Sequence, residues 1–183
     1  TPTISDPGLD LIQACIENFI KVFSIPGPSA VIASLVISGI STEQFSFLGF
    51  VPRHKKSKKM FYEKIANASE TTIFFESPKR ILKTLNDLQI FIENRKIALI
   101  RELTKKNEEI ITGNISNVLD KLEKKQTILG EITVIVSEHS KKIPYVSDQQ
   151  ILDFVKDLKI EKLGISNVSK LVADKYKVSK RRV

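Results

Sequence analysis

The chain has 183 residues, of which 42% are hydrophobic and 27% are charged, as is ordinary for a globular protein with its own core. All its apolar runs fall short of the roughly 20 residues that cross a bilayer, so we expect no membrane partner. The single cysteine, Cys15, excludes an internal disulfide and fits a reducing cytoplasm.

The formal net charge of +8 has two explanations. An excess of Lys and Arg favours a polyanionic partner, most simply a nucleic acid. Alternatively, the many Ile, Lys and Asn residues indicate an AT-rich genome that places lysine on every surface. The total charge does not separate these explanations, so the positions of the basic residues have to decide.

The N-terminal part is predicted to contain two helices. Asp6 is a plausible N-cap with Pro7 at the first helical position, and apolar residues follow at helical spacing. A short β run, Lys21–Ile25, ends at a Pro-Gly-Pro turn. Ser29–Ser38 is almost entirely apolar, which predicts a helix buried on most sides. The chain begins without a methionine or a signal peptide, so we expect it to start inside a longer protein.

Strands and helices alternate through the middle of the chain. Thr71–Glu76 and Glu131–Glu138 are apolar on both faces, as central strands covered by helices are. The alternation predicts an α/β domain with a mixed sheet. Further strands are predicted at Phe45–Phe50, Lys96–Leu103 and Glu108–Gly113. The basic stretch Arg53–Lys59 is expected to be a loop that leads into a helix ending at Ala66. Two more helices are predicted, one starting at Ser77-Pro78 and one over Ile115–Lys124.

The sequence changes in character near residue 138. Residues 139–148 are polar, charged and interrupted by proline, which predicts a linker. Residues 149–183 have a helical pattern, and the turn Tyr176–Val178 favours a small helix-turn-helix. Its second helix would begin at Ser179, just before a basic run at the end of the chain. Such an appendage either contacts nucleic acid or only packs on a domain.

Loops that follow strands are the candidate ligand positions, since ligands of α/β sheets bind at the carboxyl ends of strands. The sequence has no P-loop, no Gly-x-Gly-x-x-Gly and no cluster with metal-ligand spacing. Ser29 follows the Pro-Gly-Pro turn at a helix start, where free N–H groups and a hydroxyl can bind a polar ligand. An ordinary N-cap explains the same serine and is favoured from this loop alone.

The loops in series resemble those of a known family. The segments TPTISDPG, SIPGPSAVIASLVISGI, FSFLGFVPRHKKSKK, TIFFESPKRI, IRELTKKNEEIITG and LGEITVIV are similar in order and spacing to the tetrapyrrole methylase superfamily and, within it, to the small-subunit rRNA cytidine 2′-O-methyltransferases. The resemblance covers essentially the whole chain. It implies two α/β domains with the cofactor between them. Residues 1–24 would be a remnant of the first domain and residues 25–138 the second.

The resemblance also implies S-adenosylmethionine as the cofactor. One loop would lie against its methionine part, and the other matching positions would contact its adenosine end. The family offers no agreed catalytic base, so no catalytic residue is assigned, and no metal is expected. The implied cofactor contacts are Thr1, Ile4, Ser29, Ala30, Glu76 and Leu103.

A dense basic run follows the strand Phe45–Phe50, and it favours a phosphate-binding flap over RNA. The alternative is a solvated loop, which is the usual meaning of a charge run. Arg101 and Lys106 could extend the patch, or Arg101 could pair with Glu102 and shape its loop. The predicted RNA contacts are Arg53, Lys55, Lys56, Lys58, Lys59, Arg80, Lys105, Lys180, Arg181 and Arg182.

The function implied by the resemblance is methyl transfer to the ribose 2′-hydroxyl of a cytidine in small-subunit ribosomal RNA or the 30S subunit, by a cytoplasmic homodimer. Because strands of the first domain are absent, the chain alone is expected to bind S-adenosylmethionine weakly or not at all. Two other classes stay open, a non-enzymatic RNA-binding α/β module and a small-molecule methylase of the tetrapyrrole type. A small macrocycle needs neither the basic run nor the basic tail, which argues against the last.

Overall fold

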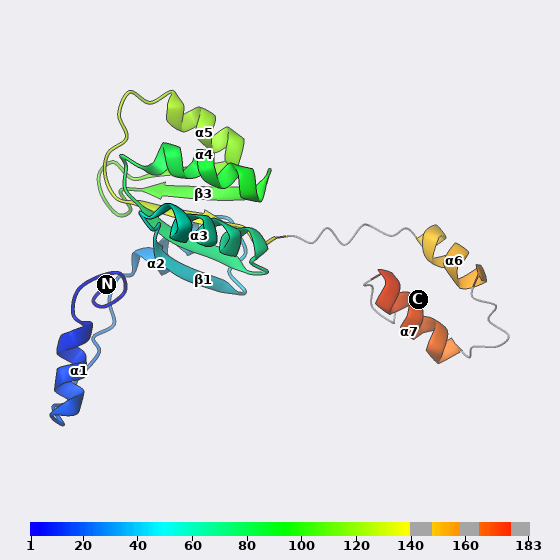
Figure 1. The fold of residues 1–183 in the computed structure, drawn as a ribbon, viewed down its shortest axis with the longest axis horizontal. Coiled ribbons are helices and arrows are strands. Elements are labelled where there is room, and N and C mark those ends of the chain that lie inside the picture. Colours follow the sequence, from blue (N-terminus) through cyan, green and yellow to red (C-terminus); the bar gives the residue numbers. More distant parts are fainter. Residues whose placement is uncertain (140–147, 158–164, 177–183) are drawn as a thin grey trace. The chain divides into compact units, whose positions relative to one another are not determined.

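The computed structural model of the chain describes residues 1–139, 148–157 and 165–176 (Figure 1). The chain forms two compact units, residues 1–139 and residues 140–183, which are described separately. Every helix in the described segments is too short or too polar to cross a membrane.

The first unit is built on a five-stranded sheet in the order β1-β2-β5-β3-β4. β1 and β2 are parallel, whereas β5 runs antiparallel to both β2 and β3, and β4 runs antiparallel to β3. The predicted α/β class with a mixed sheet is therefore confirmed. The strands are β1 (Phe45–Phe50), β2 (Thr71–Glu76), β3 (Lys96–Arg101), β4 (Glu109–Asn114) and β5 (Ile132–Val136).

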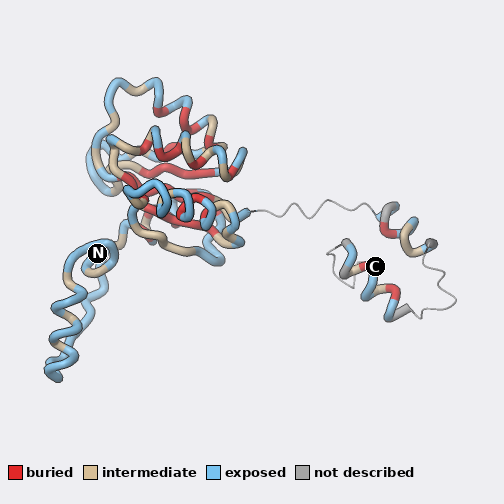
Figure 2. Tube along the Cα trace, viewed as in Figure 1, coloured by how far each residue is buried: buried red, intermediate tan, exposed pale blue. Residues whose placement is uncertain are grey.

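Helices cover both faces of this sheet. Successive residues of a strand point to opposite sides, so a strand that is apolar throughout presents an apolar surface on each face, and both surfaces are buried by helices. On β2, Ile73 joins a core with residues of α2, and the next residue, Phe74, joins the larger core on the other face. Figure 2 shows the buried residues along the strands and on the helix sides that face them. The helices of the larger core are α3 (Lys55–Asn67), α4 (Ile81–Ile92) and α5 (Ile115–Glu123), and α2 (Ala30–Ile37) covers the opposite face.

The N-terminal segment has a helix but little burial. α1 (Leu9–Glu17) begins after Gly8, so Asp6 is not its N-cap, and none of its residues is buried. The strand predicted at Lys21–Ile25 is wrong. A β run becomes a strand only where a neighbouring strand takes its hydrogen bonds, and no described strand lies beside this one. Its Phe23 and Ile25 side chains are 81% and 89% exposed.

Three further expectations about helices are wrong in detail. α2 is buried on one side only, since Val31 and Leu35 are buried whereas Val36 is 71% exposed. The basic run is not a loop, because α3 begins at Lys55 and contains four of its lysines. α4 begins at Ile81, four residues after Ser77, so the FESPKR segment ends in a turn before the helix.

The second unit contains α6 (Asp148–Asp157) and α7 (Ile165–Tyr176), which confirms the predicted helices there. Ile151, Val168 and Val172 form its small buried core. The ammonium of Lys175 lies 3.3 Å from the centroid of the Phe154 ring. The predicted turn at Tyr176–Val178 and most of the predicted linker lie outside the described residues.

Candidate functional site

The strand ends that the sequence marks as ligand positions meet at one edge of the sheet. Glu76 at the end of β2 and Arg101 at the end of β3 both pair with Ile132, the first residue of β5. The end of β1 lies beside them, because Phe50 pairs with Phe75. The carboxyl ends of three strands and the start of a fourth therefore share this edge.

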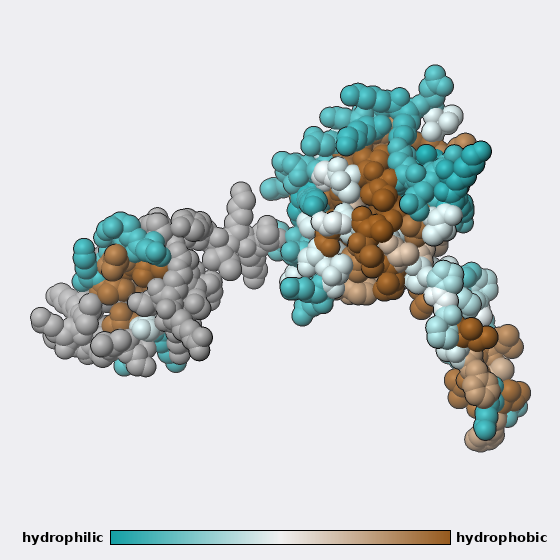
Figure 3. Space-filling view, turned by 180° about the vertical axis from the view of Figure 1, so that it is seen from behind, coloured by the Kyte–Doolittle hydropathy of each residue, from teal (hydrophilic) through white to brown (hydrophobic). Residues whose placement is uncertain are grey.

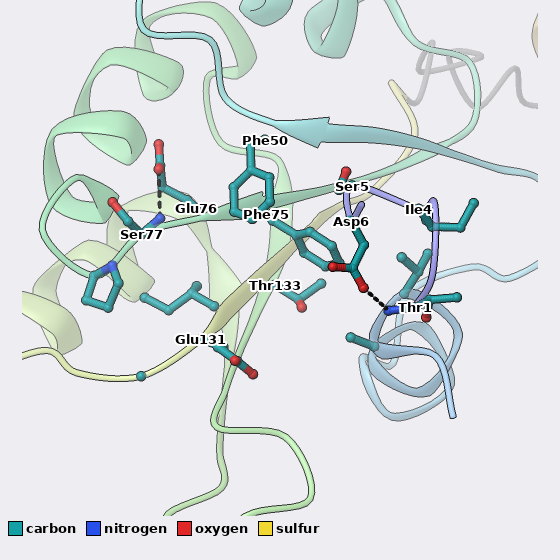
Figure 4. A pocket seen from close by; sticks show the side chains of 15 residues that line it. Thr1, Ile4, Ser5, Asp6, Phe50, Phe75, Glu76, Ser77, Glu131 and Thr133 are labelled. Atoms are coloured by element: carbon teal, nitrogen blue, oxygen red, sulfur yellow. Dashed lines mark hydrogen bonds and ion pairs between the residues drawn. The ribbon is translucent and has the colours of Figure 1, made fainter. Parts of the chain in front are cut away.

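A cavity of about 400 Å³ opens at this edge (Figure 4). A volume of this size lies within the range of about 300–1,000 Å³ that is common for cofactor sites. Five segments line it: the N-terminal loop, the start of α2, the end of β1, the end of β2, and the start of β5. The lining residues are Thr1, Ile4, Ser5, Asp6, Ala30, Val31, Phe50, Phe75, Glu76, Ser77, Pro78, Gly130, Glu131, Ile132 and Thr133.

Gly49 lets the N-terminal loop approach β1 closely. Its φ of 70° is in the left-handed region, and the β1–β2 register shifts between Phe47 and Phe50. A Cβ atom at this position would lie 3.2 Å from Ser5 Oγ. Glycine thus provides both the backbone bend and the space for Ser5 at the cavity wall.

Aromatic rings form one wall of the cavity. The Phe75 ring lies edge to face with Phe50 at 5.4 Å between centroids and with Phe47 at 4.8 Å. Phe50 is 56% exposed although it belongs to a strand of the sheet. A half-exposed ring backed by two others offers a flat apolar surface to a ligand.

The Glu76 carboxylate organises the turn between β2 and α4. It is buried, and its Oε1 accepts a hydrogen bond from the Ser77 amide at 2.7 Å. Its Oε2 accepts one from the Thr84 hydroxyl at 2.7 Å and faces Arg80 Nη2 at 3.1 Å. Arg80 Nη2 also donates to the carbonyl of Val51 at 2.7 Å. One buried carboxylate thereby fixes the loops after β1 and β2 to each other.

The predicted cofactor residues divide into two groups. Thr1, Ile4, Ala30 and Glu76 line the cavity. Ser29 lies outside the lining, at the N-cap of α2 without a side-chain capping bond. Leu103 is also outside the lining and packs on the core beneath α2.

Several lining residues were missed from the sequence. Phe50 and Phe75 read as ordinary strand residues, and Asp6 was interpreted as a helix cap. Glu131 directly precedes β5 and Thr133 lies in it, and the sequence indicates only a core role for this strand. The glycine in FLGF was the one available signal, since an isolated glycine in a strand marks a bulge or a close approach.

The predicted RNA contacts differ in their partners. Lys58 pairs with Asp87, Lys59 with Glu63, and Lys105 with both Glu102 and Glu131. By contrast, Arg53, Lys55 and Lys56 are exposed and have no ion pair among the described residues. Lys180, Arg181 and Arg182 lie outside the described part of the chain.

Arg101 does not pair with Glu102, which corrects one of the two interpretations of that loop. Arg101 Nε lies 3.1 Å from Glu109 Oε2, across the β3–β4 pair. Lys125 Nζ lies 2.7 Å from the other oxygen, Glu109 Oε1. Burial alone would raise the pKa of Glu109, but the hydrogen bonds from Lys125 and Arg101 outweigh it and hold that pKa below its ordinary value.

Glu102 instead shapes the loop after β3. Its backbone has φ 52°, and its Oε1 accepts hydrogen bonds from the Glu131 amide and from Lys105 Nζ, both at 3.0 Å. The bond from the Glu131 amide is the main reason that the pKa of Glu102 is lowered. The loop after β3 is therefore fastened to the start of β5, at the edge where the cavity lies.

Metal ligation finds no support in the residues that the structure describes, since no group of three or more His, Cys, Asp or Glu side chains converges there. The cavity suits a different ligand, one that is partly apolar and partly polar. Phe50 and Phe75 supply apolar surface. The two carboxylates at its rim are already paired, Asp6 with the Thr1 ammonium at 3.3 Å and Glu131 with Lys105 Nζ at 3.2 Å.

The sequence and the fold were compared with known proteins. The sequence model of the family "Tetrapyrrole (Corrin/Porphyrin) Methylases" matches residues 1–119. The chain resembles the methyltransferase CobJ with a TM-score of 0.54 and 16% identity, over 72% of this chain and 57% of that one. It resembles diphthine synthase with a TM-score of 0.53 and 11% identity, over 70% of this chain and 53% of that one. These two likenesses are of fold.

The curated relatives are more similar in sequence. Ribosomal RNA small subunit methyltransferase I of Hydrogenobaculum sp. (strain Y04AAS1) is 46% identical over 141 residues, which are 76% of this chain and 60% of that protein. The protein of the same name from Halalkalibacterium halodurans is 39% identical, over 78% of this chain and 49% of its own length. That of Synechocystis sp. (strain ATCC 27184 / PCC 6803 / Kazusa) is 33% identical over 100% of this chain and 66% of its own length. The chain thus spans about half to two thirds of the curated relatives that it matches.

Proposed function

We propose that this chain, which belongs to the tetrapyrrole (corrin/porphyrin) methylase family, carries the cofactor cavity of a methyltransferase that acts on the ribose 2′-hydroxyl of a cytidine in small-subunit ribosomal RNA. Relatives at 33–46% identity are named ribosomal RNA small subunit methyltransferase I, which supports rRNA as the substrate. The observation that carries the proposal is the cavity at the strand ends, because four of the six expected cofactor positions line it.

S-adenosylmethionine fits the chemistry of this cavity, and its sulfonium would supply the methyl group. The rings of Phe50 and Phe75 would hold its apolar surface, as aromatic side chains do for flat heterocycles. Asp6 and Glu131 also line the cavity, but they are paired with the Thr1 ammonium and with Lys105, so they would meet the positive charges of the cofactor only by exchanging these partners. The chain's own task is then to align the methyl group with the ribose oxygen.

The basic residues of the β1–α3 segment support a nucleic-acid substrate. Arg53, Lys55 and Lys56 are exposed and carry charges that no described carboxylate neutralises. Lysine and arginine that neutralise backbone phosphates supply much of the affinity for RNA.

Self-association in the cytoplasm is part of the same proposal. The family resemblance implies a homodimer, and the first unit leaves apolar side chains at its surface and along its N-terminal segment (Figure 3). Ile32, Val36 and Ile37 on the outer side of α2 are among those exposed. Exposed apolar patches of this kind are common at protein interfaces.

The test of the proposed function is mass mapping of ribosomal RNA from a strain that lacks the gene. We expect one ribose methyl group to disappear from a cytidine of the small-subunit RNA and to return when the gene is restored. Loss of a base methyl group, or an unchanged methylation map, would contradict the proposal.

A further inference from the structure

A second cavity, of about 230 Å³, lies between the loop after β1 and the start of α4. The residues that line it are all different from those that line the cofactor cavity. Four of its six lining residues are basic and none is acidic. The lining residues are Pro52, Arg53, Lys58, Arg80, Lys83 and Thr84.

Two of the four cations are held in place by the fold. Arg80 is fixed by the Val51 carbonyl and by Glu76, as described above. Lys58 Nζ lies 2.8 Å from Asp87 Oδ2 and 5.8 Å from the centroid of the Tyr62 ring, and its side chain is 17% exposed. Cations positioned in advance lose little conformational entropy when a ligand arrives.

The other two cations have no such partner. Arg53 and Lys83 are exposed, and neither forms an ion pair with a described residue. The four basic side chains carry four positive charges, and Glu76 and Asp87 neutralise two of them. The cavity therefore keeps two positive charges in excess.

We infer that this cavity binds a phosphate group, and that a backbone phosphodiester of the RNA substrate supplies it; the second part rests on the proposed function. Arginine presents a planar fork that fits phosphate oxygens, and lysine adds a point charge. The volume equals roughly seven or eight waters at about 30 Å³ each, so a phosphate enters together with part of an attached ribose.

The position of this cavity suits a substrate contact. Glu76 lines the cofactor cavity, and its carboxylate binds Arg80 and Thr84, which line the basic cavity. The two cavities thus lie on either side of one buried carboxylate. A phosphate bound here would hold RNA beside the cofactor cavity and so would set which nucleotide reaches it.

The test compares Lys83, in the first turn of α4, with Lys79, in the turn that precedes this helix. Lys83→Gln removes a charge from the cavity, whereas Lys79→Gln removes the same charge from an exposed residue outside its lining. Both variants are made in the full chain, together with Arg53→Gln. Binding of inorganic phosphate is followed by NMR titration, and binding of an RNA oligonucleotide by fluorescence anisotropy over a series of salt concentrations.

We expect Lys83→Gln and Arg53→Gln each to weaken phosphate binding about tenfold, the effect of one lost charge-assisted hydrogen bond. Lys79→Gln should change it less than about twofold, because salt screens a charge that makes no contact. Against RNA, each cavity variant should flatten the salt slope by about 0.7–0.9 units.

The outcomes separate the two parts of the inference. Weaker binding of both phosphate and RNA supports the cavity as an RNA phosphate site. If only phosphate binding weakens, the cavity takes a phosphate from another source, and the RNA assignment is overturned. Equal effects of Lys83→Gln and Lys79→Gln, or none, would overturn the site itself. None of these results depends on whether ribose methylation is found, so the proposed function can fail separately.

Discussion

Glu109 shows how single charged residues tie the strand ends together. Its two carboxylate oxygens meet two different cations, Arg101 from β3 at 3.1 Å and Lys125 from the segment after α5 at 2.7 Å. The side chains involved are 18–30% exposed, so water screens these pairs less than it screens a pair at the open surface. The arrangement fastens β4 and the segment after α5 to the end of β3.

This ion-pair arrangement predicts how stability depends on pH. The pKa of Glu109 is lower in the folded protein than in the unfolded chain. The ionised carboxylate therefore stabilises the fold fully above the ordinary carboxylate pKa of 4.5, and this stabilisation is lost as pH falls through the pKa of the folded protein. We expect Glu109→Gln to lower the free energy of unfolding at pH 7 and to make it depend less on pH below 4.5. Urea unfolding from pH 7 to pH 3 measures both effects.

The matched control is Glu123→Gln, which removes one charge from an exposed residue of α5. Its stability should follow the wild-type pH dependence. Parallel curves for the wild type and Glu109→Gln would show that the ion pairs of Glu109 contribute nothing.

Some residues that line the cavity can be expected from the sequence and others cannot. A resemblance of motifs carries Thr1, Ile4, Ala30 and Glu76 over one by one, and all four line the cavity. Phe50 could not be found in this way, since only the bulge at Gly49 distinguishes it from a buried strand residue. Phe50 and Phe75 are brought together by the pairing of β1 with β2, which no local pattern of the sequence records.

At the scale of elements, α3 is unusual in carrying lysines where helices favour acids. Lys55 and Lys56 occupy its first turn, and that turn has no acidic residue. Cations at a helix N-terminus oppose the helix dipole and cost about 0.3–1 kcal/mol each. A local arrangement that lowers stability without an evident structural gain is typical of functional sites.

This feature predicts opposite effects on stability and on binding. Lys55→Gln and Lys56→Gln should each raise the free energy of unfolding by about 0.3–1 kcal/mol. The same changes should weaken RNA binding and flatten its salt slope by about 0.7–0.9 units per lost contact. Chemical denaturation and RNA titration of the same samples measure the two quantities.

Lys64→Gln is the control, because Lys64 lies in the last turn of the same helix, where a cation is favourable. It should lower stability slightly and leave RNA binding unchanged. If Lys55→Gln and Lys56→Gln leave the salt slope as it is, the lysines at the start of α3 do not touch phosphates.

Most elements of the first unit were predicted, and the exceptions have a common physical cause. β1 and β2 coincide with their predicted ranges because dense apolar and aromatic runs leave few alternatives. Lys21–Ile25 has a similar composition but lacks a neighbouring strand. The sequence of α2 predicts burial on most sides, yet the structure covers only one side of it. The composition of a segment shows which of its side chains favour burial. Whether they are buried depends on which neighbouring strands and helices pack against that segment.

At the scale of the whole unit, the fold class could be predicted and the strand order could not. Alternating strands and helices indicate an α/β domain wherever the strands are placed. The order β1-β2-β5-β3-β4 depends on pairings between segments far apart in the chain. β5 is the most buried strand and joins two pairs, β1-β2 and β3-β4, that have no other connection within the sheet.

The central place of β5 predicts that both halves of the sheet lose stability together. Ile135 is fully buried in β5, and Ile135→Ala should cost about 2–5 kcal/mol. Hydrogen exchange should show the same loss for amides of β2 and of β3, because both strands pair with β5. Ile110→Ala on the edge strand β4, where the side chain is 42% exposed, should cost much less. A loss confined to one half would show that the halves unfold separately.

The same strand also sets the order of events while the chain is being made. β5 is the last strand of the sheet to be synthesised, yet it occupies the middle of the sheet. Until residue 136 has left the ribosome, the nascent chain can form only the two outer strand pairs, and the inner edges of β2 and β3 stay open. Open strand edges pair readily with other chains. The interval between synthesis of β4 and of β5 therefore leaves two strand edges open to pairing with other chains.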